Sequence, residues 1–582
     1  MISLASLNAM SAADFVSAVG NVFEHSPWVA ERAAGARPFA SRLALHEAMC
    51  AEVARASSEE QLALIRAHPE LAGRAAIRGE LTAESTREQK RAGLSSCTPE
   101  EFAQLQALNS AYSKKFGWPF ILAVKGHNPT TVIAALERRA NHNAASERAE
   151  SLDQIGRIAG FRLADLVEEP IGSEVMAMSD ALARFSDVAD ALTCSYLTPA
   201  HRAAAAQIRE WMLAAGLETE IDAVGNVVGR LPAAVSNTSG ATPVTTLITG
   251  SHYDTVTNGG KYDGRLGILL PIVVAARIRR SGVQLPYTLE IIAFAEEEGV
   301  RFKTTFLGSR AIVGRFDPAA LDLQDASGVS MRAAIADAGL DVAAISSLAR
   351  DPARVSGFIE VHIEQGPVLL SEDLPLGVVT SIAGSTRALV SIIGLAGHAG
   401  TVPMNLRRDA ATAAAEIVLA VEKRCSGTPG LVGTVGRLQV PDGAVNVIPG
   451  RCELSLDVRA PDDVTRRAAY DDIVSLCAEI ANRRQVSVDV RKVLEAGSAP
   501  CAPSMQARIA ESIRRVTGSP EARYLPSGAG HDAMMMASLA PMGMLFVRCG
   551  NNGISHHPDE LLTADDADIA GRVLTDFFQH YS

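Results

Sequence analysis

Histidine, aspartate and glutamate, the residue types that bind divalent cations, gather in five short motifs in the second part of the chain. Each motif lies at or near the end of a short apolar run: residues 251–254 (SHYD), 259–264 (GGKYDG), 296–302 (EEEGVRF), 360–366 (EVHIEQG) and 553–560 (GISHHPDE). A single His or Asp at such a place is more often a loop hydrogen-bonding residue than a metal ligand. Five motifs together predict a metal centre, and His with carboxylate ligands suits zinc or manganese.

Two cations beside one shared carboxylate would make such a centre hydrolytic. They would lower the pKa of a bound water to near neutrality. A neighbouring carboxylate could then take the proton from that water and return it to a leaving nitrogen. Adjacent glutamates beyond a strand end, such as Glu297 and Glu298, could supply one base and one ligand.

The order of the motifs resembles the hydantoinase/carbamoylase branch of the dinuclear metal amidohydrolases. The segments HYD, GGKYDG, EEGVRF, EVHIEQG, GLAGHAGTVPM, NVIPG and GISHHPDE follow one another within residues 178–582. Members of that branch cleave N-carbamoyl or ureido groups. The resemblance implies an α/β catalytic domain with two divalent metal ions, Zn²⁺ or Mn²⁺, and an inserted α+β domain that serves as lid and dimerisation domain.

The resemblance also assigns the metal ligands and the base. One ion would bind His252, Asp263 and His362, and the other would bind Asp263, Glu298 and His556, so that Asp263 bridges them. Glu297 would be the general base, and Asp254 would hold the ring of His252 from behind. In the run of three glutamates the last two are preferred because Gly-Val-Arg-Phe follows them. The Ser-His order favours His556 over His557.

Substrate-binding residues follow from the same resemblance. The substrate would contact Gln365, Arg387, Asn446 and Arg459. The two arginines suit a planar carboxylate because a guanidinium presents a fork of donors. His398 would stabilise the oxyanion from the partner subunit of a homodimer. The alternative for each arginine is a solvated surface charge.

The first part of the chain carries a weaker chemical signal. His68 lies in RAHPELAG, Glu88 lies in STREQKRAGL, and the segment KFGWPFILAVKG covers residues 115–126. On the residues alone, a His before a Pro is more often a structural residue at a helix end. In order, however, these motifs resemble 2-oxo-4-hydroxy-4-carboxy-5-ureidoimidazoline (OHCU) decarboxylase, a small all-helical enzyme that makes (S)-allantoin in urate degradation.

The second resemblance spans about residues 5–168 and implies a cofactor-free decarboxylase. Its catalytic residues would be His68 and Glu88, and its substrate-binding residues would be Pro69, Ser85, Phe120, Ile121, Leu122 and Arg162. The C=N bond of the substrate can accept the electrons left by carbon dioxide, so the protein need supply only an acid or base near pH 7, a task that suits His. The Glu in HPELAG, where Asp is commoner, is a mild departure.

Together the two resemblances imply a bifunctional enzyme of purine degradation. One half would produce (S)-allantoin and the other would hydrolyse allantoate to ureidoglycine (ureidoglycolate), ammonia and CO₂. The shared pathway, not the metal motifs, selects allantoate. The alternatives are an N-carbamoyl-L-amino acid hydrolase or ureidoglycolate hydrolase, with the helical half as a non-catalytic interaction module. A dinuclear peptidase is disfavoured by EEGVRF and HIEQG.

The elements that must position these residues follow two patterns. Apolar residues at three-to-four spacing predict helices at 43–56, 60–67, 99–116, 130–141 and 147–167; residues 118–124 are open between strand and buried loop. Thereafter a helix at 199–215 precedes apolar strands at 244–249, 289–294, 358–363 and 542–547, typical of an α/β sheet. Strands at 388–395, 431–438 and 453–459 predict the inserted unit.

The domain boundaries follow from this change of pattern. We expect an all-α domain at 1–168, a Pro- and Gly-containing linker at 169–177, a catalytic domain at 178–381 and 498–582, and an inserted dimerisation and substrate-binding domain at 382–497. Every cluster of ligand-type residues in the sequence lies after residue 250.

Composition excludes several other classes. The 582 residues carry 54 Lys and Arg against 66 Asp and Glu, a net charge of −12, which argues against nucleic acid as a partner. The apolar run Leu266–Ala276 is shorter than the roughly 20 residues of a membrane span and is expected to be a buried helix. No secretion or lipidation signal is evident, and the eight cysteines form no CxxC pair, so a cytoplasmic protein with buried thiols is expected.

Overall fold

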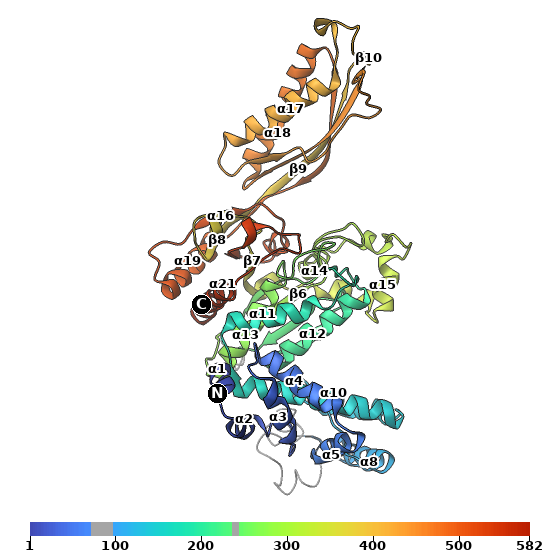
Figure 1. Ribbon diagram of the computed structural model, residues 1–582, viewed down its shortest axis with the longest axis vertical. Helices are drawn as coiled ribbons and strands as arrows, with labels where there is room; N and C mark the ends of the chain where they lie inside the picture. The colour runs from blue at the N-terminus through green and yellow to red at the C-terminus, as the bar shows by residue number, and fades with distance from the viewer. Residues whose placement is uncertain (72–96, 235–243, 582) are drawn as a thin grey trace.

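The computed structural model describes residues 1–71, 97–234 and 244–581. Its three parts lie one after another along the longest axis (Figure 1): a helical N-terminal part, an α/β part, and an inserted α+β part that projects from the far side of the sheet. No helix in the described ranges is long and apolar enough to cross a membrane.

The N-terminal part is helical, as predicted. Its helices are α1 (Leu4–Ala9), α2 (Ala12–Val19), α3 (Trp28–Ala33), α4 (Arg42–Arg55), α5 (Ser58–Ala67), α8 (Pro99–Phe116), α9 (Pro129–Arg139) and α10 (Ala144–Leu166). Thr98 and Asn128 cap α8 and α9, each just before a proline, which suits the first turn. Residues 118–124 form a buried loop and no strand. A short parallel pair, β1 (Ile2–Ser3) with β2 (Val167–Glu168), joins both ends of this part.

A nine-stranded mixed sheet forms the centre of the α/β part. Its path runs β16 (Ala499–Pro500), β8 (Leu376–Ile382), β18 (Met542–Val547), β7 (Val355–Ile363), β5 (Thr246–His252), β6 (Thr288–Phe294), β4 (Val227–Leu231) and β3 (Glu218–Ile221), and β17 (Tyr524–Ser527) pairs with β8. The four strands β18, β7, β5 and β6 are parallel and buried, which explains their continuous apolar sequences.

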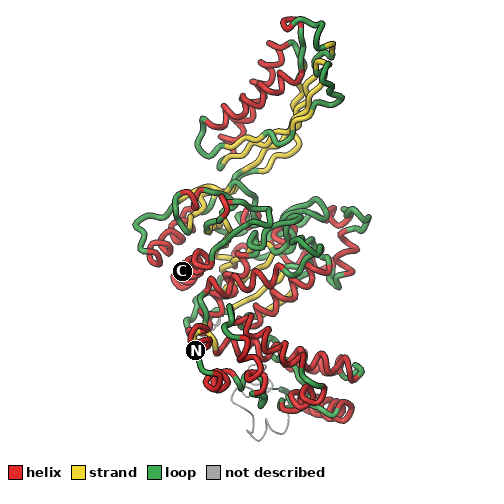
Figure 2. Tube along the Cα trace, viewed as in Figure 1, coloured by secondary structure: helices red, strands yellow, loops and turns green. Residues whose placement is uncertain are grey.

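Helices cover both faces of this sheet (Figure 2). Helices α11 (Ile171–Ala183), α12 (Pro199–Ala215), α13 (Leu266–Ser281), α19 (Pro503–Thr517) and α21 (Ala564–His580) share one core with the sheet. The shorter α14 (Leu307–Ile312), α16 (Val368–Ser371) and α20 (Ala533–Met536) pack on the other face, and α15 (Met331–Asp337) lies to one side. The run Leu266–Ala276 is thus part of a buried helix, as expected.

The inserted part has its own sheet and its own core. The strands follow the order β11 (Val432–Thr434), β14 (Arg451–Ala460), β9 (Gly384–Ile393) and β15 (Ser487–Ala496), with β12 (Leu438–Gln439) also on β14. Helices α17 (Ala410–Ser426) and α18 (Asp463–Arg484) pack on one face. The single strand predicted at 431–438 is instead two short strands, because residues 435–437 leave the ladder. The small pair β10 (Gly397–His398) and β13 (Val447–Ile448) lies at the outer tip (Figure 1).

The predicted linker at 169–177 is too long, because most of these residues belong to a helix. Helix α11 begins at Ile171, directly after Glu169-Pro170, and its first turns are buried. Gly172 touches α21 so closely that a β carbon there would lie 1.8 Å from the carbonyl oxygen of Ala564. Pro170 and Gly172 led to the prediction of a linker, although the apolar residues Ile171, Val175, Met178 and Leu182 recur at helical spacing.

Candidate functional site: a metal centre and a helical pocket

The predicted metal ligands meet at the carboxyl ends of the parallel strands. His252 ends β5, Glu297 and Glu298 follow β6, and His362 lies near the end of β7. Asp263 comes from the loop before α13, and His556 comes from the loop before α21. Parallel strands bring these ends to one edge of the sheet, where ligands of α/β proteins bind.

The carboxylate of Asp263 lies between two groups of donor atoms. Its Oδ1 is 3.3 Å from Nε2 of His362 and 3.9 Å from Nε2 of His252. Its Oδ2 is 3.2 Å from Nε2 of His556, which is 3.7 Å from Oε1 of Glu298. Within each of these two groups the donor atoms lie within 4.8 Å of one another. Ions with bonds of about 2.0–2.2 Å to N and O ligands need such spacing, so the donor set fits two divalent cations that share Asp263.

The two histidines of the first group are oriented from behind. Nδ1 of His252 faces Asp254, 3.1 Å from its carbonyl oxygen and 3.5 Å from its carboxylate. Nδ1 of His362 donates to the carbonyl of Ile363 at 2.8 Å. Both rings therefore present Nε2 to Asp263, the arrangement typical of metal-binding histidines.

Asp254 also fixes the two glutamates. Its carboxylate accepts the peptide N–H groups of Glu297 and Glu298, each at 3.1 Å. Burial raises the pKa of Glu297 well above its usual range, although the nearby His252 opposes the shift. His252, Glu297 and Glu298 form a further candidate ligand group, whereas the fully buried Glu296 belongs to none of the groups found among the described residues.

Two residues of this centre were not predicted from the sequence. Oε1 of Glu560 accepts the N–H groups of Tyr262 and Asp263 at 2.9 and 3.0 Å, and Ser555 donates to both Glu560 and Asp263. Both lie in the GISHHPDE motif, which was the available signal. Gln365, predicted to contact substrate, donates its amide to both oxygens of Asp263 at 3.0 Å.

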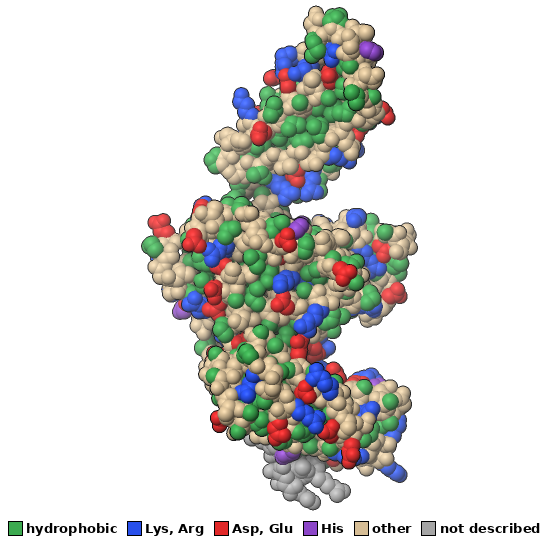
Figure 3. Space-filling model, viewed as in Figure 1, with side chains coloured by type: hydrophobic (Ala, Val, Ile, Leu, Met, Phe, Trp, Pro, Cys, Tyr) green, Lys and Arg blue, Asp and Glu red, His purple; other side chains and the backbone are tan. Residues whose placement is uncertain are grey.

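The predicted substrate residues of the inserted part fall into two places. Arg387 and Arg459 both pair with Asp457, at 3.2 and 2.9 Å, and Arg459 also donates to the carbonyl of Gly528 in the α/β part at 2.7 Å. Lys and Arg side chains gather beside the narrow neck between these parts (Figure 3). His398 and Asn446 lie at the outer tip with β10, where Asn446 accepts the N–H of Ala399. One chain therefore does not bring this pair to its own metal ligands.

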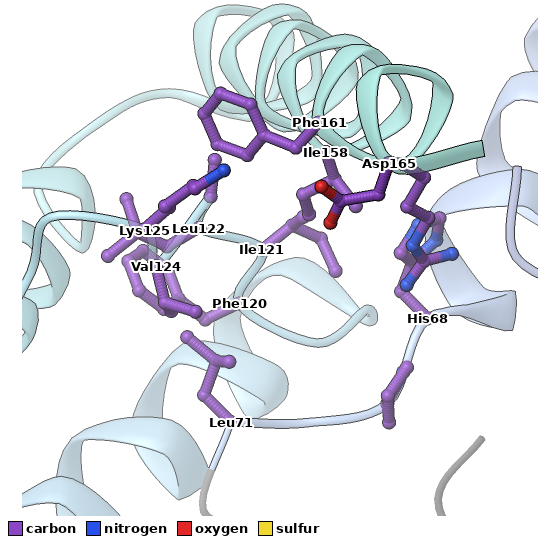
Figure 4. Close-up of a pocket in the computed structure, with 13 residues that line it drawn as sticks. His68, Leu71, Phe120, Ile121, Leu122, Val124, Lys125, Ile158, Phe161 and Asp165 are labelled. Atoms are coloured by element: carbon purple, nitrogen blue, oxygen red, sulfur yellow. The ribbon is translucent and has the colours of Figure 1, made fainter. Parts of the chain in front are cut away.

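The helical part contains a cavity around His68 (Figure 4). Its lining comprises His68, Pro69, Leu71, Phe120, Ile121, Leu122, Ala123, Val124, Lys125, Ile158, Phe161, Arg162 and Asp165. Six of the eight predicted residues, His68 and Arg162 among them, thus converge on one cavity. Ser85 and Glu88 lie outside the described residues. Lys125 and Asp165 were not predicted, although Lys125 belongs to the WPFILAVKG segment.

The imidazole of His68 is held as a neutral base. It ends α5, and its Nδ1 donates to the carbonyl of Leu64 at 3.0 Å. Its buried Nε2 has no hydrogen-bond partner within the described ranges. Burial lowers the pKa of His68 to about 4, so the ring is uncharged near neutral pH. Arg162 is held by Glu24 at 2.7 Å and by the carbonyl of Val22.

One cluster of metal-ligand residue types does lie before residue 250, contrary to the sequence expectation. His142, Glu147 and Glu150 have donor atoms within 4.8 Å of one another. The fully buried Arg139, however, donates to Glu147 at 2.5 Å, and Arg138 pairs with Glu150 at 2.6 Å. These guanidinium groups neutralise the carboxylates, so the cluster forms an ion-pair network that joins α9 to α10.

Comparison with known proteins gives two family matches. A family model described as OHCU decarboxylase matches residues 8–164, and one described as peptidase family M20/M25/M40 matches residues 248–580. An allantoate deiminase from Arabidopsis thaliana is 38% identical over 444 residues, which cover 71% of this chain and 83% of that protein. An N-carbamoyl-L-amino acid amidohydrolase from Geobacillus stearothermophilus is 39% identical over 378 residues, 65% of this chain and 90% of that protein.

A solved structure extends the similarity to the fold. The crystal structure of an amidase of the hydantoinase/carbamoylase family from Burkholderia multivorans aligns with a TM-score of 0.65 at 29% identity. The alignment covers 70% of this chain and 97% of that one.

Proposed function

The chain belongs to the M20/M25/M40 peptidase family and carries an OHCU decarboxylase domain ahead of it; from this premise we propose that it joins two enzymes of urate degradation. The first half decarboxylates OHCU to (S)-allantoin. The second hydrolyses allantoate to ureidoglycine (ureidoglycolate), ammonia and CO₂. The observation that carries the second activity is the placement of Asp263 between two His-and-carboxylate groups, with Glu297 beside them.

The residues of the metal centre suit hydrolysis of a ureido group. His252, Asp263 and His362 would hold one divalent cation, and Asp263, Glu298 and His556 would hold the other, Zn²⁺ or Mn²⁺. When bound, such ions activate water and polarise a carbonyl. Glu297 accepts the proton of the attacking water and delivers it to the leaving nitrogen. The carboxylate of Asp254 accepts the peptide N–H of Glu297 and so keeps this base aligned during the proton transfer.

The substrate carboxylate is assigned to the arginines of the inserted part. Arg387 and Arg459 line one hollow together with Gly528 at the neck, which allows a guanidinium fork to reach a ligand between the two parts. Gln365 donates to Asp263 beside the other metal ligands, and we assign it to the ureido end of the substrate.

A second copy of the chain is proposed to complete the site. The tip that carries His398 and Asn446 exposes Leu395, Met404, Leu406, Val445 and Val447. Several exposed apolar side chains in one region are typical of association surfaces. A homodimer through the inserted part would cover them and bring the partner's His398 to the oxyanion. Light scattering of the purified protein, with Met404→Asp and Leu406→Asp as interface variants, tests this arrangement.

The decarboxylase half uses the cavity around His68. Nε2 of His68, which has no hydrogen-bond partner among the described residues, belongs to a neutral imidazole. It accepts a proton from the substrate and returns that proton to the carbon atom on which departing carbon dioxide leaves its electron pair. Arg162 and the Phe120–Leu122 backbone hold the ureido ring. Glu88 and Ser85 are proposed to complete this pocket.

One assay panel tests both halves. Ammonia release is measured over allantoate, ureidoglycolate and N-carbamoyl-L-amino acids, and (S)-allantoin formation is measured from freshly generated OHCU. We expect allantoate to give the highest kcat/KM. A preference for an N-carbamoyl-L-amino acid, the substrate type named for the Geobacillus relative, would replace the allantoate assignment. His68→Ala should stop allantoin production and leave allantoate hydrolysis intact.

A further inference from the structure

Residues 120–125 of the loop after α8 form one wall of the His68 cavity, and three hydrogen bonds to residues outside the loop anchor them. Arg139 donates to the carbonyl of Ile121 at 2.5 Å, and Gln154 accepts the N–H of Ala123 at 3.0 Å. Both anchors belong to the helical half. The third anchor is Lys125, whose ammonium group crosses to the other half and donates to the carbonyl of Ala214 at 2.6 Å.

The acceptor of Lys125 is suited to a cation. Ala214 lies in the last turn of α12, where backbone carbonyls have no partner within the helix. The carboxyl end of a helix also attracts positive charge. Lys125 further lies over the ring of Phe161, 4.9 Å from its centroid, and both residues line the cavity. A single side chain thus connects the cavity wall, α10 and α12.

Gly126, the residue after Lys125, also contacts the amidohydrolase half. Gly126 packs against Leu213 of α12, and a β carbon on Gly126 would lie 2.3 Å from Cδ2 of Leu213. Its φ of +81° is also one that glycine adopts without strain. Leu213 is buried and does not line the cavity, and its contact with Gly126 links it to the wall.

We infer that Lys125 is a positioning residue through which α12 of the amidohydrolase half fixes the substrate-binding wall of the decarboxylase half. The inference rests on the proposed decarboxylase function. Its physical basis is that the backbone of Phe120–Leu122 binds the ring well only if the loop is already fixed, because a loop that must be ordered on binding lowers the affinity. The second half of the chain therefore supports the first active site from behind its wall.

The chain offers a matched control for this inference. Arg184 pairs with Glu47 across the same two halves, at 2.6 Å, but neither residue lines the His68 cavity. Arg184→Ala therefore weakens the contact between the halves without touching the wall. Lys125→Arg keeps both the donor to Ala214 and the cation over Phe161.

The experiment measures kcat and KM for OHCU decarboxylation, and kcat/KM for allantoate, in full-length variants. Lys125→Met should raise the KM for OHCU by roughly three- to tenfold with a smaller change in kcat, as expected when a preorganised binding surface is lost. Leu213→Ala should act in the same direction, Lys125→Arg should restore the wild-type KM, and Arg184→Ala should behave as wild type. Allantoate hydrolysis should be unchanged in all four.

Three outcomes would overturn the inference, and a fourth is separate from them. Wild-type kinetics in Lys125→Met would remove the role of Lys125. An equal rise in the KM for OHCU in Arg184→Ala would mean that any weakening of the contact between the halves disturbs the wall, with no specific role for Lys125. A defect in Lys125→Met with none in Leu213→Ala would make Lys125 a direct substrate contact. If the wild-type chain itself failed to decarboxylate OHCU, the proposed function would fall, and this inference with it.

Discussion

The carboxylate of Asp254 accepts the peptide N–H of Glu297 at 3.1 Å while the Nδ1 of His252 faces the same residue. One buried side chain thus sets both the ring of a metal ligand and the position of the base. Asp254→Asn keeps the size but removes the charge. We expect about 10- to 100-fold weaker metal binding or lower activity, typical of residues that support a ligand. Metal analysis and kcat for allantoate measure this, with the exposed Asp559→Asn as control.

The neighbouring glutamates should separate by function. Glu297→Gln should retain both metal ions and lose turnover by about 10²–10⁴-fold, as for removal of a general base. Glu298→Gln should instead lower the metal content, because its Oε1 lies 3.7 Å from the donor atom of His556. Metal analysis of the two purified variants decides the assignment, and the reverse pattern would exchange the two roles.

Removal of metal should affect one half only. Chelation is expected to abolish ammonia release from allantoate and to spare (S)-allantoin formation, because the cavity around His68 is lined by no second metal-ligand histidine or cysteine within the described residues. Circular dichroism serves as the control for unfolding. Loss of decarboxylation from a folded, chelated protein would point to a metal in the helical half, with His142, Glu147 and Glu150 as the first residues to substitute.

Arg459 should report on carboxylate binding. Arg459→Lys keeps the charge but loses the fork that now reaches Asp457 and the carbonyl of Gly528. We expect kcat/KM for allantoate to fall by about tenfold or more with both metal ions still bound. Arg451→Lys, at an exposed pair on the same strand, provides the control. Unaltered kinetics in Arg459→Lys would exclude it from the carboxylate site.

The buried His68 predicts a pH dependence of stability. Burial lowers its pKa to about 4 in the folded chain, against about 6.5 when unfolded. Between these values the unfolded state binds the extra proton, so stability increases as pH rises through this window and is lost as pH falls. From pH 7.5 to pH 5 the loss should be about 2 kcal/mol from this group. Denaturant unfolding of wild type and His68→Gln measures it; an equal pH slope in both would refute the contribution.

Local sequence patterns predicted the elements better than the contacts between them. Helices at Pro99–Phe116 and Pro199–Ala215 have the predicted bounds, because the capping residues and the apolar periodicity that define a helix lie within its own sequence. Helix α11 was missed because Pro170 and Gly172 resemble a linker, whereas close packing on α21 requires that glycine.

In the candidate site, too, residue types could be predicted from the sequence but contacts between distant residues could not. The ligand types were readable because each follows an apolar strand, but the support of Asp263 by Glu560 joins residues almost 300 positions apart. The contact of Lys125 with Ala214 likewise depends on how two halves pack. No periodicity encodes such contacts, since they arise only when separate elements meet in three dimensions.

The packing of α11 on α21 has a consequence for how the chain is made. A ribosome releases the helical half first, and its core is built entirely from residues 4–167. Helix α11 emerges next; it packs on α13 and on α21, and α21 is synthesised last, at residues 564–580. The part of α11 that packs on α21 must therefore remain uncovered while nearly four hundred further residues are synthesised, a long-range closure that slows folding and exposes the nascent chain to aggregation. The residues that form the core of the helical half are thus all synthesised well before those that close the core of the amidohydrolase half.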